Sequence, residues 1–215
     1  MKHSSVKKMV LLAMLAAISY LLVSLVRIPV VLFLKYEPKD VVITIGGFLF
    51  GPMASFMVSL VVSLLEMVTV SDTGPIGCVM NLLSTCSFAC TAALIYKKKH
   101  TLRGAITGLI LGSVLMVITM LLWNWLITPW YMGVDRGTVE GMLLPAFLPF
   151  NLLKAGLNSA LTLSLYKPLV TALRKVHLIE YAPGNAAASK HGVYLFAAVL
   201  LATCILLLLA LQGKI

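Results

Sequence analysis

Four polar residues recur on one face of an otherwise apolar stretch late in the chain. Asn151, Lys154, Asn158 and Thr162 lie at i, i+3, i+7 and i+11 within residues 145–166, where Lys154 is the only charged residue. At about 100° per residue, a helix places all four on one face. A cation near the middle of a membrane span costs roughly 3 kcal/mol, so it needs a partner or a task. The pattern indicates the wall of a buried ligand site.

Three asparagines share the level of this lysine in the predicted bilayer. Asn81, Asn124, Asn151 and Lys154 all map to its middle or outer half. Amides present donors and acceptors that match the edges of a heterocycle, and Lys154 donates to carbonyl or ring-nitrogen acceptors. Nearby Trp, Phe, Leu and Met side chains supply apolar contact for a flat ring. We expect an outward-facing pocket for a neutral, hydrogen-bond-rich and partly aromatic solute.

Each of these polar residues also has a simpler interpretation. Glu66 lies near the outer end of a predicted span, so it reaches the interface, pairs with a cation or accepts hydrogen bonds from a ligand. Asn81 is equally compatible with hydrogen bonding between helices, and Asn124 with a capped interfacial amide. Snorkelling of Lys154 is the less favoured option, because it lies about 14 Å from the outer end of its helix.

The amino-acid composition indicates that these residues belong to a protein embedded in lipid. The 215 residues are 60% hydrophobic and 11% charged, with a mean hydropathy of +1.02. Soluble domains carry about 25% charged residues. The apolar surface exceeds what one small core can bury, so this is an integral membrane protein.

Apolar runs separated by turn signals divide the chain into seven predicted spans. The first, 9–26, is interpreted as a retained span and not as a cleaved signal. The outer loop at 27–40 is too apolar to be merely solvated, so we expect it to pack back onto the protein; the other outer loops are 71–77 and 131–144. The remaining spans are 41–50, 53–70, 78–96, 104–127, 145–166 (which extends towards Lys175) and 192–211.

The charges orient these spans. Three basic clusters are separated by even numbers of spans and contain Lys2, Lys7, Lys8, Lys97, Lys98, Lys99, Arg103, Lys167, Arg174, Lys175 and Lys190. Five acids fall in the other loops: Glu37, Asp40, Asp72, Asp135 and Glu140. This asymmetry places the clusters and the N-terminus in the cytoplasm. It also explains the net charge of +10 without nucleic acid.

Small residues at four-residue spacing mark close helix contacts. The pairs are Ala13/Ala17 and Gly47/Gly51, with the triplet Gly104/Gly108/Gly112. Packing inside the protein is the favoured interpretation. For Ala13 and Ala17, a docking surface for another subunit is the alternative.

Signatures of catalysis and of ATP hydrolysis are missing from the sequence. It has no GxxxxGK[ST] phosphate loop, no HExxH zinc pair and no GxSxG turn. Its four cysteines form no CxxC motif and are interpreted as small apolar helix residues. We therefore expect a protein that is not an enzyme, binds no metal or cofactor, and needs partner subunits for energised uptake.

Several segments together resemble the riboflavin-specific S component of energy-coupling factor (ECF) transporters. They are KYEPKDVVITIGGFLFGP from Lys35, SDTGPIG followed by Asn81, NWLITPWY from Asn124, and Asn151-x-x-Lys154. The Ala13/Ala17 pair is similar to the small-xxx-small motif on the first helix of that family. The resemblance spans about residues 8–175.

The resemblance implies a six-helix, all-α membrane protein of the bacterial plasma membrane that captures riboflavin from outside. A T subunit and two ATPase subunits would energise the import, with Ala13 and Ala17 touching the T subunit. The flavin would lie near Asn124, Asn151 and Lys154, and the resemblance extends less directly to Asn81, Thr73, Asp40 and Glu66. Residues 1–175 would form this domain, with a cytoplasmic linker at 176–191 and an additional C-terminal span at 192–215.

Two other hypotheses stay open at this point. One keeps the S-component fold but changes the ligand to another vitamin or heterocyclic solute. The other is a membrane-embedded enzyme or an assembly factor, which would need a reactive constellation of residues that the sequence does not offer.

Overall fold

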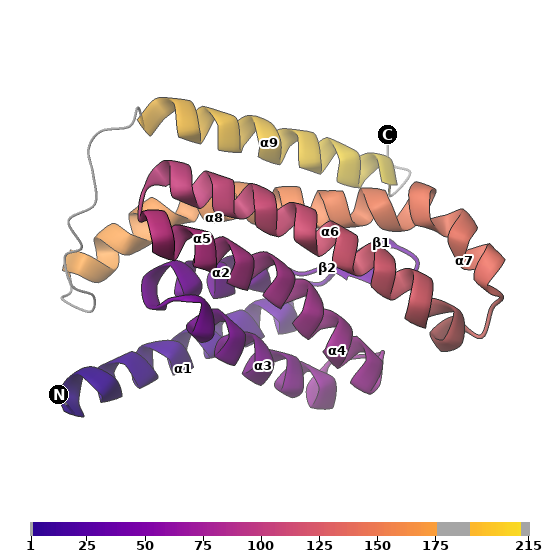
Figure 1. The fold of residues 1–215 in the computed structure, drawn as a ribbon, viewed down its shortest axis with the longest axis horizontal. Helices are drawn as coiled ribbons and strands as arrows, with labels where there is room; N and C mark the ends of the chain where they lie inside the picture. The colour runs from indigo at the N-terminus through magenta and orange to yellow at the C-terminus, as the bar shows by residue number, and fades with distance from the viewer. Residues whose placement is uncertain (1, 176–189, 212–215) are drawn as a thin grey trace.

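The computed structural model describes residues 2–175 and 190–211, and nearly all of them are helical. Figure 1 shows long helices lying side by side, with α1 and α9 on opposite sides of the bundle. The elements are α1 Lys2–Leu25, β1 Ile28–Val31, β2 Leu34–Tyr36, α2 Lys39–Phe50, α3 Pro52–Thr69, α4 Gly74–Thr85, η1 Cys86–Cys90, α5 Thr91–Lys99, α6 Leu102–Met132, α7 Arg136–Met142, η2 Leu143–Phe147, α8 Leu148–Lys175 and α9 Lys190–Leu211.

The described helices confirm a membrane protein that crosses the bilayer several times. Four helical stretches are long and apolar enough to span it: Val6–Leu25, Pro52–Thr69, Gly74–Lys99 and Leu102–Met132. Helix α2 has 12 residues, which at about 1.5 Å per residue is shorter than the roughly 30 Å hydrocarbon core. The predicted linker at 176–191 lies almost entirely outside the described residues.

The first outer loop contains the only strands of the described residues, so the expectation of an all-α protein was wrong in this detail. Strands β1 and β2 pair antiparallel, with Ile28 opposite Tyr36 and Pro29 opposite Lys35. Leu34 and Tyr36 face inward and are buried. The prediction that this apolar segment packs back onto the protein is confirmed. Alternation of inward and outward side chains over so few residues gave too weak a strand signal.

One helical passage is built from three segments. Helix α4 continues through the π-helical turn η1 into α5, so the turn-rich sequence at 71–77 is half helical, with Pro75 in the first turn. A Cβ on Gly112 would come within 2.5 Å of the Phe88 carbonyl oxygen, and one on Gly108 within 2.7 Å of that of Ala92. These glycines therefore let α6 lie directly against the α5 passage, and their predicted packing role is confirmed.

The segment predicted as an outer loop at 131–144 is largely helical. Helix α6 runs through Pro129 to Met132 and ends at Gly133, whose φ of +65° closes the helix in the left-handed conformation. Helix α7 follows at once, capped by Asp135, whose carboxylate accepts a hydrogen bond from the Thr138 amide at 2.9 Å. The loop prediction was wrong because α6 continues for three residues beyond Pro129, although the proline removes one backbone hydrogen bond, and α7 begins only a few residues later.

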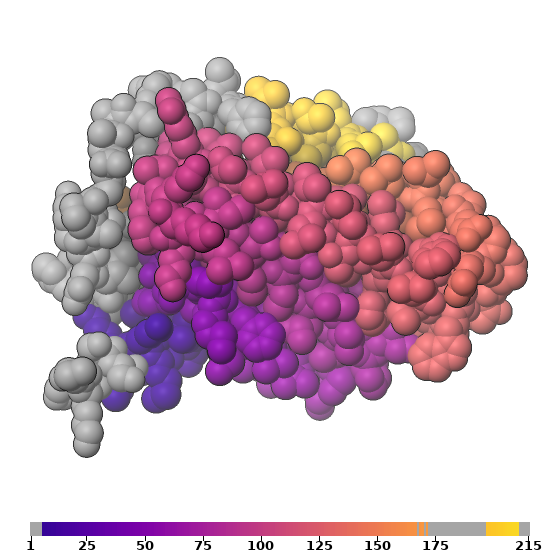
Figure 2. All heavy atoms as spheres, in the orientation of Figure 1, coloured from indigo at the N-terminus to yellow at the C-terminus, as the bar shows by residue number. Residues whose placement is uncertain are grey.

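Helix α8 carries the polar stripe, and α9 lies along it. Helix α8 runs on to Lys175, as the sequence predicted for this segment. Asn151, Lys154, Asn158 and Thr162 are all buried, so snorkelling of the lysine is ruled out. In the space-filling view, the yellow atoms of α9 form one edge of the molecule beside the orange residues that follow α6 (Figure 2).

Two apolar clusters fill the interior. One joins α2, α3, the α5 passage and α6 around Phe88 and Met116. The other lies under the hairpin and joins it to α7, η2, α8 and α9 around Phe147 and Leu153. The interior therefore consists of two separately packed groups of elements.

Candidate ligand-binding pocket

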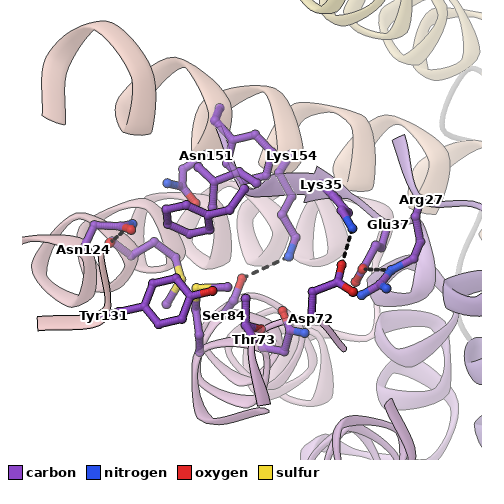
Figure 3. Close-up of a pocket in the computed structure, with 16 residues that line it drawn as sticks. Arg27, Lys35, Glu37, Asp72, Thr73, Ser84, Asn124, Tyr131, Asn151 and Lys154 are labelled. Carbon is purple, nitrogen blue, oxygen red and sulfur yellow. Dashed lines mark hydrogen bonds and ion pairs between the residues drawn. The ribbon is translucent and has the colours of Figure 1, made fainter. Parts of the chain in front are cut away.

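A cavity of about 240 Å³ opens where the hairpin, α4, α6 and α8 meet at one end of the bundle. Figure 3 shows the labelled side chains converging on it from different elements. Its walls are Arg27, Phe33, Leu34, Lys35 and Glu37 around the hairpin, Asp72, Thr73, Met80, Asn81 and Ser84 on or before α4, Met120, Asn124 and Tyr131 on α6, and Phe150, Asn151 and Lys154 on α8.

The apolar part of the lining is aromatic. Phe33 at the hairpin turn meets Tyr131 of α6 edge to face, with ring centroids 5.6 Å apart. Phe150 joins them from α8, and Met80 and Met120 add flexible thioether surface. Such walls suit a flat ring system, with a few polar groups left to fix its orientation.

Lys154 is held in the pocket wall by a buried carboxylate. Its ammonium nitrogen lies 3.3 Å from Asp40 Oδ2 and donates to Ser84 Oγ at 3.3 Å. Asp40 also accepts hydrogen bonds from Thr85 Oγ1 at 2.6 Å and from Asn158 Nδ2 at 3.1 Å. An ammonium group has three N–H donors, so one is left for a ligand.

The stripe on α8 therefore has two parts with different surroundings. Asn151 and Lys154 line the cavity. Asn158 lies one turn further in, where it donates to Asp40 and accepts a hydrogen bond from the Tyr36 hydroxyl at 3.1 Å. Thr162 Oγ1 is buried and has no partner among the described residues. The inner part fixes the hairpin and Asp40 in place, and the outer part faces the cavity.

Two amides are oriented by their own helices. Asn124 Nδ2 donates to the Met120 carbonyl at 2.7 Å, and its oxygen accepts from Thr128 Oγ1 at 2.9 Å. Asn151 Nδ2 donates to the Phe147 carbonyl at 2.8 Å. Its oxygen has no hydrogen-bond partner among the described residues. Each amide keeps unused hydrogen-bonding capacity in a fixed orientation.

Glu66 is the centre of a second buried network beside the cavity. Its carboxylate pairs with Lys39 and with Arg27, the latter at 3.4 Å, and accepts a hydrogen bond from Asn81 Nδ2 at 2.8 Å. Glu37 pairs with Arg27 at 2.9 Å and with Lys39 at 3.2 Å. Glu66 is 1% exposed, so it pairs with cations and does not reach the interface.

A third pair crosses the cavity rim. Lys35 on β2 donates to Asp72 Oδ2, before α4, at 2.5 Å. This hydrogen bond and the ammonium charge lower the pKa of Asp72. The pair joins the hairpin to the α3–α4 connection and is exposed to solvent.

The charges around the cavity balance. Four cations (Arg27, Lys35, Lys39 and Lys154) pair with four acids (Glu37, Asp40, Glu66 and Asp72) in the described part of the chain. A charged ligand would therefore have to separate an existing pair, whereas a neutral one leaves every pair intact.

The structure brings together five of the residues expected to bind substrate. Thr73, Asn81, Asn124, Asn151 and Lys154 all line the cavity. Asp40 and Glu66 lie behind the wall, where they hold Lys154 and Asn81 in place.

Several lining residues were not among the expected ones. Phe33 and Phe150 carry no motif, because such residues are common in any membrane protein, and Tyr131 ends the NWLITPWY segment but was not singled out for binding. Arg27, Lys35 and Glu37 were assigned to an outer loop. Their best signal was the apolar character of that loop, which indicated that it folds back.

The first helix presents its small residues outward. Ala13 and Ala17 are exposed, as are Met9, Met14 and Ile18. For this pair, internal packing was the wrong interpretation, and a contact with lipid or another subunit remains.

Comparison with known proteins identifies the class. Residues 7–166 match the family described as "ECF transporter, substrate-specific component". The chain belongs to this family, and it is a multi-pass membrane protein whose named relatives are transporters.

Individual relatives agree with the family. The chain is 29% identical to the riboflavin transporter RibU of Staphylococcus aureus (strain TCH60), over 79% of this chain and 94% of that protein. It is 28% identical to the riboflavin transporter FmnP of Bacillus subtilis (strain 168), over 80% of this chain and 98% of that protein. A solved structure titled "Structure and mechanism of the S component of a bacterial ECF transporter" superposes with a TM-score of 0.68 at 31% identity, covering 79% of this chain and 99% of that one.

Proposed function

We propose that this protein is the riboflavin-binding membrane subunit of an ECF-type importer. The observation that carries the proposal is the cavity itself, with aromatic walls, oriented amides and an ammonium group that is already neutralised. The named relatives are riboflavin transporters, and the chain covers nearly their whole length.

The chemistry of riboflavin fits this cavity. Its ring presents an N–H flanked by two carbonyl oxygens, which Asn124, Asn151 and the remaining N–H of Lys154 complement. Phe33, Tyr131 and Phe150 offer faces and edges for the flat ring. The hydroxylated ribityl chain would meet the donors and acceptors that gather on the opposite side of the cavity in Figure 3.

Residues behind the wall have a supporting task in this proposal. Asp40 holds Lys154 in position and pairs with its ammonium group, and Glu66 orients Asn81. Thr73 lies at the rim beside Asp72. Their substitution is expected to change affinity through the neighbours that they hold.

Transport requires partners that we infer from the family. We propose that a T subunit docks on the exposed face of α1 at Ala13 and Ala17, where small side chains allow a close helix contact. Two ATPase subunits would supply the energy. The basic clusters support a cytoplasmic N-terminus in the bacterial plasma membrane, six spans up to Lys175 and α9 as a seventh.

The experiment is a flavin titration of the purified protein in detergent. We expect a yellow protein that quenches riboflavin fluorescence with one ligand per chain. N151A and K154A should bind more weakly, while V199A, on the exposed face of α9, should bind like the wild type. A protein that binds no flavin but is stabilised by another vitamin would keep the transport role and reject riboflavin.

A further inference from the structure

Helix α9 is the part of this chain that its family does not account for. The family match ends at residue 166. The alignments with two relatives include 94% and 98% of those proteins but only 79% and 80% of this chain. A helix outside the shared fold either lies at the edge of the bundle without influencing the rest of the protein or stabilises the elements next to it. Its contacts distinguish these options.

Helix α9 packs closely along α8, and the two helices come nearest at Gly156 and Cys204. A Cβ on Gly156 of α8 would come within 2.5 Å of Cys204 Sγ. Cys204 is 6% exposed, and Ala197 is buried with Ala155 and Leu163 in the apolar cluster around Phe88 and Met116. Gly156 therefore serves as the point of closest approach between the two helices.

The same face of α9 reaches the cluster beneath the hairpin. Cys204 is a buried member of that cluster, and Leu200, Leu201 and Leu208 pack against it. Its other members include Val30 and Leu34 of the hairpin and Phe150 of α8. Helix α9 also contacts β1 directly. Figure 1 shows the C-terminal end of α9 on the same side of the bundle as the hairpin.

The hairpin is a small element that depends on its neighbours, and α9 is one of them, beside α7, η2 and α8. It has two short strands, and its turn holds Leu32 at a φ of +52°, a conformation that costs energy for a side chain of this kind. A two-stranded hairpin has marginal stability unless it packs on other elements. Its far edge contributes Phe33, Leu34 and Lys35 to the cavity wall.

We propose that α9 is a brace that holds the β1–β2 hairpin over the pocket and so slows the escape of bound ligand. The positioning residues are Cys204 and Leu208, which act through the hairpin and α8 and touch no ligand. This inference adds to the proposed riboflavin binding, because it concerns how long the ligand stays. Helix α9 lies on the opposite side of the bundle from α1 (Figure 1), so the brace leaves the proposed docking face of α1 uncovered.

The first test measures the hairpin directly and needs no ligand. Hydrogen exchange by mass spectrometry is followed for residues 28–36 in the ligand-free protein. L208A removes a side chain packed on the cluster, and L206A removes the same side chain from a position that is 58% exposed. We expect exchange of the hairpin amides to be about threefold faster or more in L208A and unchanged in L206A. Equal exchange in the two variants would overturn the brace.

The second test alters the contact between Gly156 of α8 and Cys204 of α9. G156A adds a methyl group against Cys204 and should speed both hairpin exchange and riboflavin dissociation by about fivefold or more, as overpacking strains the contact. In the double variant G156A/C204A the new methyl group takes the place of the sulfur in the contact between the helices, so both rates should return to within about twofold of the wild type. The proportion of chains that bind riboflavin at saturation should stay the same, whereas a general folding defect would lower it.

The outcomes separate this inference from the proposed function. A wild-type protein that binds no riboflavin but shows the expected exchange differences would keep the brace and reject the ligand. Tight riboflavin binding with identical exchange and dissociation in L208A, L206A and G156A would keep the ligand and reject the brace. If G156A fails to fold, the pair L208A and L206A decides alone.

Discussion

The pair between Asp40 and Lys154 is the contact on which the pocket wall depends most, and D40N tests it. The asparagine keeps one oxygen but replaces the other with an NH₂ donor. This donor faces either Lys154 and Asn158, which contact Oδ2, or Thr85, which contacts Oδ1, and all three are themselves donors. Lys154 then lies 5% exposed without a counter-charge. Removing one partner of a buried pair typically costs about 3–5 kcal/mol.

We expect the lower part of that range, about 3 kcal/mol, because Lys154 lines a cavity that water can enter. For a chain of this length, such a loss lowers the unfolding midpoint by about 6–12 °C. The assay is thermal unfolding in detergent without ligand. A shift no larger than that of an ordinary surface substitution, about 0.5 kcal/mol, would refute the buried pair.

The double variant D40N/K154M separates stability from ligand contact. With both charges removed, no buried charge is left unpaired, so most of the lost stability should return. Riboflavin affinity should stay low, because the ammonium donor is missing. Recovery of both stability and affinity would mean that Lys154 serves only to neutralise Asp40.

Three further predictions concern the amide, the docking face and the rim. N151A should weaken riboflavin binding about tenfold or more in a fluorescence titration, because it removes a carbonyl oxygen that lines the cavity and has no partner among the described residues; unchanged affinity would remove Asn151 from the site. A17W should leave riboflavin affinity intact but abolish copurification with a T subunit, because the large side chain blocks a close helix contact. A202W makes the same change on the exposed face of α9 and should copurify normally. Loss of copurification in both variants would indicate a general defect. The pKa of Asp72 lies below its ordinary value of 3.8 because Lys35 is beside it, and Asp72 holds the hairpin to the rim only while it is ionised. Riboflavin dissociation should therefore accelerate as the pH falls through the pKa of Asp72 in the folded protein. D72N should release riboflavin faster at pH 7, and its dissociation rate should not show this pH dependence.

The sequence predicted the membrane-spanning character and the polar stripe because both depend on strong local signals. A charge in an apolar segment, such as Lys154, is costly enough to require a partner or a function. Its position on one face with Asn151 follows from helix geometry alone. Spacing within one helix is therefore readable without any tertiary information.

The partners of these residues were not predictable in the same way. Asp40 is 114 positions from Lys154, and Glu66 reaches both Asn81 and Lys39 across three elements. Such pairs depend on how helices pack, and one sequence carries no periodic signal for that. The hairpin was also missed, because strands of four and three residues are too short to show alternation.

The aromatic lining and the place of α9 were hidden for a further reason. Phe33, Tyr131 and Phe150 resemble every other apolar residue of a membrane protein until their helices are placed. Gly156 and Cys204 are 48 positions apart in the sequence, and they meet only because α9 packs against α8. Both features depend on packing geometry and not on residue type.

The most direct measurement is an experimental structure of the protein with riboflavin bound. We expect density for the flavin ring in the cavity between the hairpin and α8, with its carbonyl edge within hydrogen-bond distance of Asn151 and Lys154 and its face against Phe33, Tyr131 or Phe150. Density for the flavin elsewhere, with side chains filling this cavity and Lys154 paired only with Asp40, would contradict the account.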